Sequence, residues 1–382
     1  MKKIFAALFL AAGAALAGEQ LLNLPPAPKG GRFPVPQDRV WPEKPGEADI
    51  CLWHNDRFGA CCITIDDNCQ PDHAWWMKLS DELGIKLTWF VITDGVVKNG
   101  TRKGTFQGCW EEWQVLADAG HSIQSHTTNH RSDPPEKNRT PETKLLAEED
   151  LVCMYSNSLA VINANLTNNF ACCIAYPSGD PHTEVLSRYA IAARGVYGVP
   201  STANTINYLC TNKGAGGRGH VEMVAFGETE EGPNWVRGMK NLRRGLNIVL
   251  YHFVHSGRSE EEREKNAANA EAEVRYIASL KDDRLWVCRF DDVMKYGQER
   301  DSATLTVTDN TEAKIAFTLT DRMKDDVFTF PLTVKVRLPD TWKTVQARQG
   351  GRAVEAAFVT HEGAPYVLVK AVPDKGEVIL TK

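Results

Sequence analysis

The stretch Cys61-Cys62-Ile63-Thr64-Ile65-Asp66-Asp67 decides the fold. Its first five residues are apolar or β-branched and predict a short buried strand, and two aspartates follow at its carboxyl end. In barrels and open α/β sheets, functional side chains gather where parallel strands end and loops begin. Paired aspartates are also common in solvated turns and helix caps, so this pair indicates a site only if other functional residues join it.

Short apolar strands alternate with amphipathic helices on the carboxyl side of this stretch. Strands and helices alternating at this spacing predict a parallel sheet or barrel wrapped by helices, which is an α/β fold. We expect strands at 61–65, 86–92, 121–125, 170–175 and 247–253, and helices at 72–83, 110–119, after residue 141 and at 259–281.

The hydrophobic period changes from 3.6 to 2 after about Ser302, which predicts a small all-β, sandwich-like domain at 303–382. Seven prolines in residues 18–50 predict an extended lead-in without regular strand pairing. The catalytic domain is expected to span 51–300. Within it, residues 199–240 show little periodicity and predict a long irregular insertion.

The first residues predict export. Lys2 and Lys3 precede an apolar run from Ile4 to Ala17 that ends in a small-x-small pattern, so residues 1–17 resemble a bacterial-type secretory signal peptide. No apolar run is long enough to span a bilayer. We therefore expect a secreted or periplasmic protein with no membrane span. All ten cysteines follow the expected cleavage point, where both disulfides and buried thiols are possible.

Composition narrows the class of partner. The chain has 382 residues, 42% hydrophobic and 24% charged, which is typical of globular proteins and excludes disordered, collagen-like and multi-span membrane classes. Lys and Arg total 44 against 49 Asp and Glu, and this slightly acidic balance argues against nucleic-acid binding. The oligomeric state stays open.

Two further strand ends carry histidines. The strand at 121–125 runs into His126, with His130 four residues later, and Leu250-Tyr251-His252 ends another apolar strand. Two histidines and one carboxylate form a three-ligand set for a divalent transition metal, with coordination positions left open. Taken singly, a histidine pair is often no ligand, and a lone histidine such as His252 is more often a core residue.

Together these motifs resemble the polysaccharide deacetylase (NodB-homology) family of carbohydrate esterases. The resemblance covers roughly residues 58–298, with five family elements in order. They are Thr64-Ile65-Asp66-Asp67-Asn68, Gly84-Ile85-Lys86-Leu87-Thr88-Trp89-Phe90-Val91, Gly120-His121 with His126-Thr127-Thr128-Asn129-His130, Ala175-Tyr176-Pro177-Ser178-Gly179, and Leu250-Tyr251-His252.

The resemblance implies a distorted (β/α) barrel and a role for each matching residue. Asp67, His126 and His130 would bind a divalent metal ion, with zinc expected and cobalt or nickel as alternatives. Asp66 would be the general base toward the attacking water, and His252 the general acid toward the leaving group. The segment Tyr176, Pro177 and Ser178 would line the oxyanion and substrate region, with the Ser178 N–H facing the oxyanion.

The implied activity is removal of acetyl groups from a polysaccharide or oligosaccharide, with N-acetyl groups favoured. An O-acetyl esterase acting on xylan-like glycans and a catalytically inactive glycan-binding relative are the alternatives. The second alternative arises because Ala175 stands where many relatives place an arginine that orients the base, and because the family's fourth motif, Asp-x-x-Asp-Trp, is not found. Several tryptophans could stack on sugar rings or belong to the core, and sequence does not separate these: Trp53, Trp75, Trp76, Trp89 and Trp110.

Overall fold

A computed structural model describes residues 39–98, 106–196, 201–203, 206–211, 221–222, 245–281 and 284–382. The predicted signal peptide and most of the predicted 199–240 insertion lie outside the described residues. Within the described part, no helix is both long enough and apolar enough to cross a membrane.

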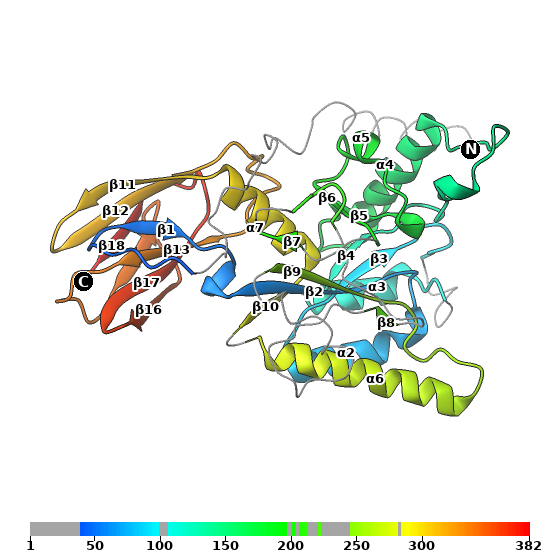
Figure 1. Cartoon of the computed structure of the whole chain (residues 1–382), viewed down its shortest axis with the longest axis horizontal. Helices are drawn as coiled ribbons and strands as arrows, with labels where there is room; N and C mark the ends of the chain where they lie inside the picture. The colour runs from blue at the N-terminus through cyan, green and yellow to red at the C-terminus, as the bar shows by residue number, and fades with distance from the viewer. Residues whose placement is uncertain are drawn as a thin grey trace.

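A curled, mostly parallel sheet forms the larger region, and it runs beside a separate antiparallel region (Figure 1). The strand order is β6-β5-β4-β3-β2-β9-β7, and β10 pairs in parallel with the first half of β2. This arrangement confirms the predicted α/β class. The strands are β2 (Gly59–Ile65), β3 (Thr88–Val91), β4 (Ser122–Ser125), β5 (Cys173–Ala175), β6 (Ala192–Arg194), β7 (Ser201–Thr202), β8 (Val221–Glu222), β9 (Gly245–Tyr251) and β10 (Leu285–Cys288).

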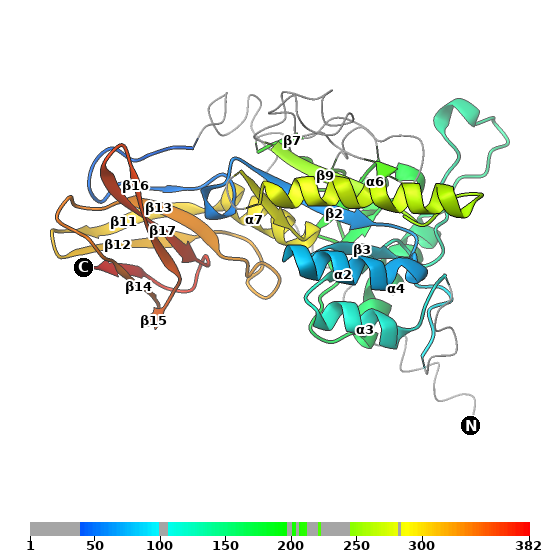
Figure 2. The same cartoon turned by 90° about the horizontal axis from the view of Figure 1, so that it is seen from below.

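Helices cover this sheet as the apolar periodicity predicts. Helices α2 (His73–Leu83) and α6 (Glu260–Ser279) lie side by side, and α3 (Trp110–Asp118) and α4 (Glu148–Asn165) pack against β4 (Figure 2). The short α5 (Thr183–Leu186) follows β5. Helices α2, α3 and α6 begin and end within two residues of their expected bounds, and α4 lies after residue 141 as expected, whereas the short α5 was not predicted.

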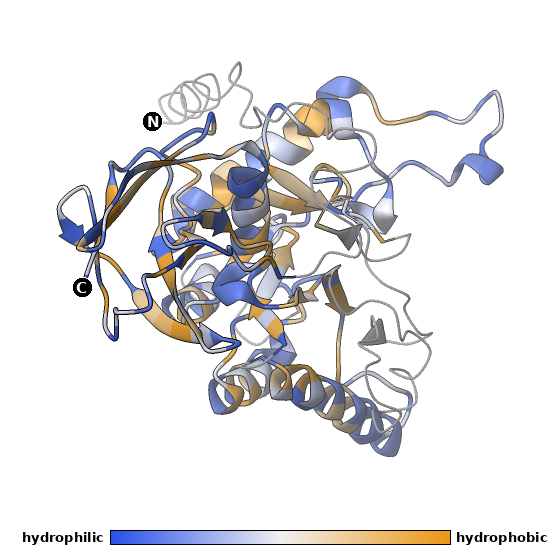
Figure 3. Ribbon diagram, turned by 60° about the vertical axis from the view of Figure 1, so that its left-hand side comes forward, coloured by the Kyte–Doolittle hydropathy of each residue, from blue (hydrophilic) through white to orange (hydrophobic). Residues whose placement is uncertain are grey.

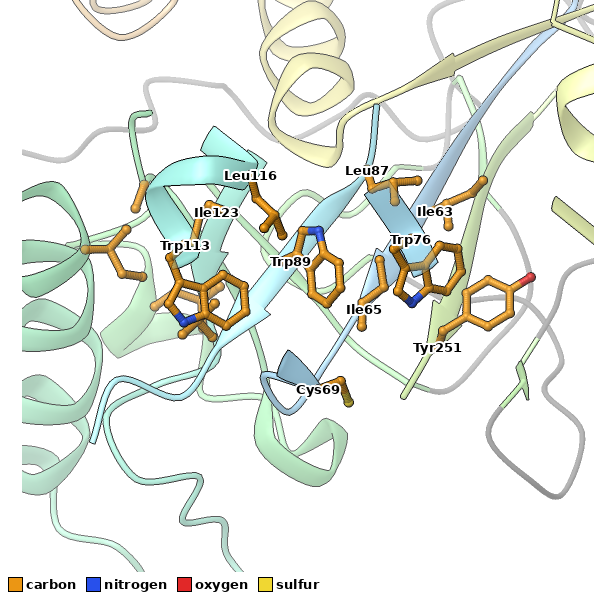
Figure 4. Close-up of a cluster of buried hydrophobic side chains, with 14 of the residues drawn as sticks. Ile63, Ile65, Cys69, Trp76, Leu87, Trp89, Trp113, Leu116, Ile123 and Tyr251 are labelled. Carbon is orange, nitrogen blue, oxygen red and sulfur yellow. The ribbon is translucent and has the colours of Figure 1, made fainter. Parts of the chain in front are cut away.

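The core between α2, α3 and the sheet is built around aromatic rings. Trp76, Trp89, Trp113 and Tyr251 are buried and lie in a row between the helices and β2, β3 and β9 (Figure 4). Trp53 and Trp110 are buried as well, and only Trp75 among the five sequence candidates is half-buried. Four of those five tryptophans are thus core residues, so their rings are not available to stack on sugars.

The C-terminal region is a sandwich of two antiparallel sheets, as predicted. Their strand orders are β1-β13-β17-β16 and β11-β12-β18-β14-β15. Alternate apolar side chains from both sheets, including Phe317, Val334 and Val369, form the core between them, and the apolar stretches of the strands are visible in Figure 3. The strands are β11 (Thr304–Asn310), β12 (Lys314–Thr320), β13 (Leu332–Arg337), β14 (Gln346–Gln349), β15 (Arg352–Ala353), β16 (Ala356–His361), β17 (Ala364–Ala371) and β18 (Val378–Thr381).

The expectation that the lead-in pairs with no strand is wrong at its carboxyl end. Residues Ala48–Ile50 form β1, which pairs antiparallel with β13 of the sandwich. This is possible because the last proline of the lead-in is Pro45, so the N–H groups of residues 48–50 are available for pairing. Helix α7 (Phe290–Ser302) joins the two regions, and the Tyr296 hydroxyl donates to the Cys51 carbonyl oxygen at 2.7 Å.

All ten cysteines lie in the described residues, and none is bonded to another. Cys61 and Cys62 alternate along β2 into two different apolar clusters, and the Cys62 Sγ lies 3.9 Å from the Cys288 Sγ on the neighbouring strand. Eight of the ten cysteines are buried and act as small core residues, whereas Cys153 is exposed and Cys210 is half-buried.

The tryptophan row gives a stability prediction. Trp89→Ala removes a ring that packs 4.6 Å from His73 and 5.7 Å from Trp113, measured between ring centroids. We expect it to lower the free energy of unfolding by about 3–5 kcal/mol in urea titration. The control is Val115→Ala on α3, a residue 58% exposed, which should change the value by less than about 0.5 kcal/mol. Equal losses in both variants would contradict the buried position of Trp89.

Candidate active site

The candidate residues meet at the carboxyl edge of the parallel sheet. Asp66 and Asp67 follow β2, His126 follows β4, and His252 follows β9. Strands β2 and β9 are in register, with Ile65 opposite Tyr251, and the Asp66 N–H donates to the Tyr251 carbonyl oxygen at 2.9 Å. Parallel pairing thus brings together side chains that are almost 190 residues apart in the sequence.

Three of these side chains converge as a metal site requires. The Asp67 Oδ1 atom lies 3.5 Å from His126 Nε2 and 3.5 Å from His130 Nε2. The three ligand atoms all lie within 4.8 Å of one another. Sequence reasoning picked this set, and the structure brings all three together.

Two observations show that these residues fit a metal ion. Asp67 Oδ1 is buried and has no hydrogen-bond partner among the described residues, so an acceptor stands free beside two imidazoles. His126 Nδ1 lies 2.9 Å from the Ala175 carbonyl oxygen, which can only accept, so Nδ1 carries the hydrogen and Nε2 presents a lone pair. Burial lowers the pKa of His126, which favours the neutral imidazole that a metal requires.

Asp66 is held by a partner that sequence reasoning missed. Arg194 Nη2 donates to Asp66 Oδ2, and both side chains are buried. Burial alone would raise the pKa of Asp66, but the positive charge of Arg194 and the neighbouring histidines outweigh it and lower the pKa below its usual value. Asp66 is therefore ionised at neutral pH, and its Oδ1 atom is buried without a hydrogen-bond partner in the described structure.

Arg194 supplies the arginine that is absent at position 175. Arg194 ends β6, and its Cα partner on the neighbouring parallel strand is Ala175, the position where many relatives carry an arginine. The guanidinium thus reaches Asp66 from one strand further along the sheet. In the sequence, Arg194 is a single arginine directly after the short apolar segment 190–193. Such an arginine resembles a surface residue, so the sequence gives no clear sign of its role.

His252 lies on the other side of the Asp67 carboxylate. Its Nε2 is 3.6 Å from Asp67 Oδ2, and its side chain is 32% exposed. The loop after His252 is fixed by the buried Asp72, which accepts from the Val254 N–H at 2.7 Å and contacts His255 Nδ1 at 2.6 Å. Asp72 thus anchors the loop that presents His252, and no sequence motif pointed to it.

The predicted oxyanion and substrate segment is only partly exposed to a ligand. The prediction that the Tyr176 side chain lines the substrate region is wrong, because its ring is fully buried. Its hydroxyl donates to the Leu209 carbonyl oxygen, and its N–H donates to the Arg194 carbonyl oxygen. It supports the site from within the core. Pro177 is buried too, whereas Ser178 is exposed and accepts at Oγ from Ser132 on the loop that carries His130. The role of the Ser178 N–H stays a prediction.

Left-handed backbone conformations cluster at these loops. Asp67, Asn68 and Cys69 have φ of 57°, 64° and 44° in succession, and His130 and Ser178 have φ of 57° and 54°. Such conformations are unfavourable for residues with a Cβ and persist only where surrounding contacts impose them. Asn68 stands where the family pattern has glycine, and asparagine is among the residues that best tolerate this region.

Asn68 also supplies the contacts that impose this geometry. Its side chain accepts from the Ile92 N–H at 2.8 Å and donates to the carbonyl oxygens of Ile92 and Gln107, at 3.1 and 3.3 Å. The loop that carries Asp67 is therefore fixed to the end of β3 and to the segment before α3.

A second cluster lies beside the first. Asp133, Asp180 and His182 also have ligand atoms within 4.8 Å of one another. Their carboxylates already accept from main-chain N–H groups, Asp180 from Asp133 and Asp133 from Leu146, and His182 Nε2 lies 3.0 Å from Asp180 Oδ2. These bonds join the loop after His130 to the loop after Ser178, which explains the cluster without an ion.

The chain is thus an α/β protein whose curled parallel sheet carries a carboxylate pair and a histidine pair at its carboxyl edge, with a three-residue candidate metal site among them. Residues 55–194 match the family model described as polysaccharide deacetylase. The resemblance inferred from the sequence motifs is confirmed.

One curated relative and several solved structures are similar to the chain. A gellan lyase from Bacillus sp. is 35% identical over an alignment of 379 residues, which covers 94% of this chain but only 14% of that protein's length. A polysaccharide deacetylase structure from Mycobacterium smegmatis is 13% identical with a TM-score of 0.41, covering 71% of this chain and 98% of that one. A peptidoglycan N-acetylglucosamine deacetylase is 14% identical with a TM-score of 0.35, covering 60% and 85%.

The ligand set predicts one metal ion per chain. Zinc titration of chelator-treated protein by calorimetry should give a stoichiometry near one. His126→Ala should weaken binding by on the order of 100-fold or more, because even changes to groups behind the ligands cost up to that much. His182→Ala in the second cluster is the matched control and should bind zinc like the wild type. Loss of binding in the His182 variant instead would place the ion in the second cluster.

Proposed function

We propose that this protein is a metal-dependent hydrolase that removes acetyl groups from a glycan. The observation that carries the proposal is the free Asp66 Oδ1 atom beside the converging ligand atoms of Asp67, His126 and His130. The match of residues 55–194 to the polysaccharide deacetylase family model supports it. The half-buried His252 side chain near Asp67 supports it further, because its exposed part can reach a leaving group from solvent.

In this proposal Asp67 is a metal ligand and Asp66 is the general base. Held by Asp67 and the two histidines, a divalent cation would polarise the acetyl carbonyl and make the attacking water more acidic. Asp66 Oδ1 takes a proton from that water, while Oδ2 stays bound to Arg194. Arg194 keeps Asp66 ionised and fixes its rotamer, so it is a positioning residue for the base.

His252 completes the proton balance. Water oxygen bonds to the acetyl carbon, the bond to the sugar nitrogen or oxygen breaks, and His252 gives the leaving atom a proton. An amine leaves less readily than an alcohol and depends more on this proton. N-acetyl substrates are our first choice, and O-acetyl groups on xylan-like glycans are the alternative.

The third possibility is an inactive glycan-binding relative, and one of the two reasons for considering it no longer holds. It was considered because Ala175 replaces an arginine, and Arg194 supplies a guanidinium to the same carboxylate. The relative's name refers to gellan, so gellan belongs among the substrates to test. Export through the segment 1–17 remains part of the proposal, together with zinc as the ion.

An acetate-release assay tests the proposal. Zinc-loaded protein is incubated with chitooligosaccharide, peptidoglycan, poly-N-acetylglucosamine, acetylated xylan and gellan, and free acetate is measured. Release from the first three supports the amide reaction, and release from the acetylated esters alone supports the ester reaction. Asp66→Asn should lower kcat by about 10²–10⁴-fold and still bind zinc, because it removes the base but not a ligand. Full turnover in Asp66→Asn would refute the role of Asp66.

The position of Arg194 gives a more specific prediction. Arg194→Ala should lower kcat and move the acidic limb of the kcat/KM profile to higher pH, because the pKa of Asp66 rises when its cation is removed. The base must be ionised to act, so activity is lost below that higher pKa.

The neighbouring strand offers a matched rescue. Arg194→Ala combined with Ala175→Arg places a guanidinium at the Cα partner position, and we expect it to return part of the lost activity and move the acidic limb back. Leaving a buried carboxylate unpaired costs about 3–5 kcal/mol, so thermal unfolding is measured for each variant. An unmoved acidic limb in a folded Arg194→Ala variant would refute the positioning role.

A further inference from the structure

An aromatic pair stands at the mouth of the site, outside the machinery described so far. Phe253 directly follows His252, and Phe106 precedes α3. Their ring centroids are 5.2 Å apart with an interplanar angle of 47°. Phe106 is 38% exposed and Phe253 is half-buried, so the two rings together present an apolar surface to solvent.

The register of the sheet places Phe253 beside the ligand set. Ile65 on β2 is the Cα partner of Tyr251 on β9, and Asp67 and Phe253 each lie two residues beyond that pair. The intervening His252 reaches to within 3.6 Å of Asp67. Phe253 therefore flanks the edge at which the acetyl group would be cleaved.

Phe106 is bonded to the same loop from the other direction. The Gln70 N–H donates to the Phe106 carbonyl oxygen at 3.3 Å, and the Asn68 side chain donates to the next carbonyl, that of Gln107, at 3.3 Å. Trp113 Nε1 also donates to Gln107 O, at 3.2 Å. These bonds hold the main chain at Phe106 and Gln107 next to the segment that carries Asp67, so the exposed Phe106 side chain starts from a fixed backbone beside the site.

An exposed apolar surface next to a polar site is typical of a ligand-binding rim. Among the described residues, Trp53, Trp76, Trp89 and Trp110 are buried in the core, whereas Phe106 and Phe253 present ring surface to solvent beside the site. We propose that Phe106 and Phe253 form a platform that binds the apolar face of a pyranose ring of the glycan, next to the sugar that carries the acetyl group. This inference rests on the proposed deacetylase function and adds a subsite to it.

The test compares a long substrate with a short one. Phe106→Ala should lower kcat/KM for tetra-N-acetylchitotetraose about tenfold more than it lowers kcat/KM for 4-nitrophenyl acetate, which has no sugar ring; a tenfold change corresponds to about 1.4 kcal/mol. Phe106→Trp should restore the tetramer activity. Phe358→Ala, at a phenylalanine 37% exposed on β16 of the sandwich, is the matched control and should change neither. Equal losses on both substrates would show a structural role and overturn the platform.

Binding separates this inference from the proposed function. If the wild type releases no acetate, calorimetry with the N-acetylated chitotetraose and with xylotetraose still tests the platform. Weaker binding in Phe106→Ala than in Phe358→Ala would support it, and binding of neither probe by the wild type would overturn it. A change in oligomeric state of Phe106→Ala in sedimentation velocity would assign the rings to contact between copies of the chain, which would also overturn it.

Discussion

The buried ion pair between Arg194 and Asp66 is the constraint on which the site depends. Arg194 ends β6, Asp66 follows β2, and β5, β4 and β3 lie between them in the sheet. A flat sheet would separate these groups by four strand spacings, about 19 Å. The sheet must therefore curl until its two parts face each other. Between β6 and β2, the guanidinium carbon of Arg194 lies 5.3 Å from the centroid of the Phe90 ring on β3. The ion pair between Arg194 and Asp66 can therefore form only if the sheet is curved.

Much of the backbone near this pair has an unusual conformation. A buried carboxylate is unfavourable without its cation, so both side chains must be held in fixed positions. The loops that carry Asp67, His130 and Ser178 all contain left-handed residues, and each is held by specific hydrogen bonds rather than by regular structure. Because β2, β4 and β5 are buried and fixed, the loops that follow them can be kept in conformations that an isolated peptide would avoid.

Sequence patterns predicted the parts of this molecule that depend on local rules. The strand before Asp66, the histidine spacing at 126 and 130 and the helix periods all follow from neighbouring residues. Arg194 could not be found in this way, because a buried arginine is recognisable only by its distant partner. The same holds for Asp72, whose partners at 254 and 255 follow the neighbouring strand β9, and for β1, whose pairing with β13 is set by tertiary contact. Tyr176 matched its motif, yet the strand direction turned its ring into the core.

The pairing of β1 with β13 changes how the two regions are connected. Residues Ala48–Ile50 and the strands from Thr304 onward belong to one sandwich, so the parallel sheet is an insertion within it rather than a module placed before it. The relative that matches this chain does so over 379 residues, which include both parts of the sandwich. Two chain segments, one entering and one leaving, therefore connect the sheet to the sandwich. A body held at two points cannot swing as it would on a single linker, so the orientation of the parallel sheet relative to the sandwich is restricted.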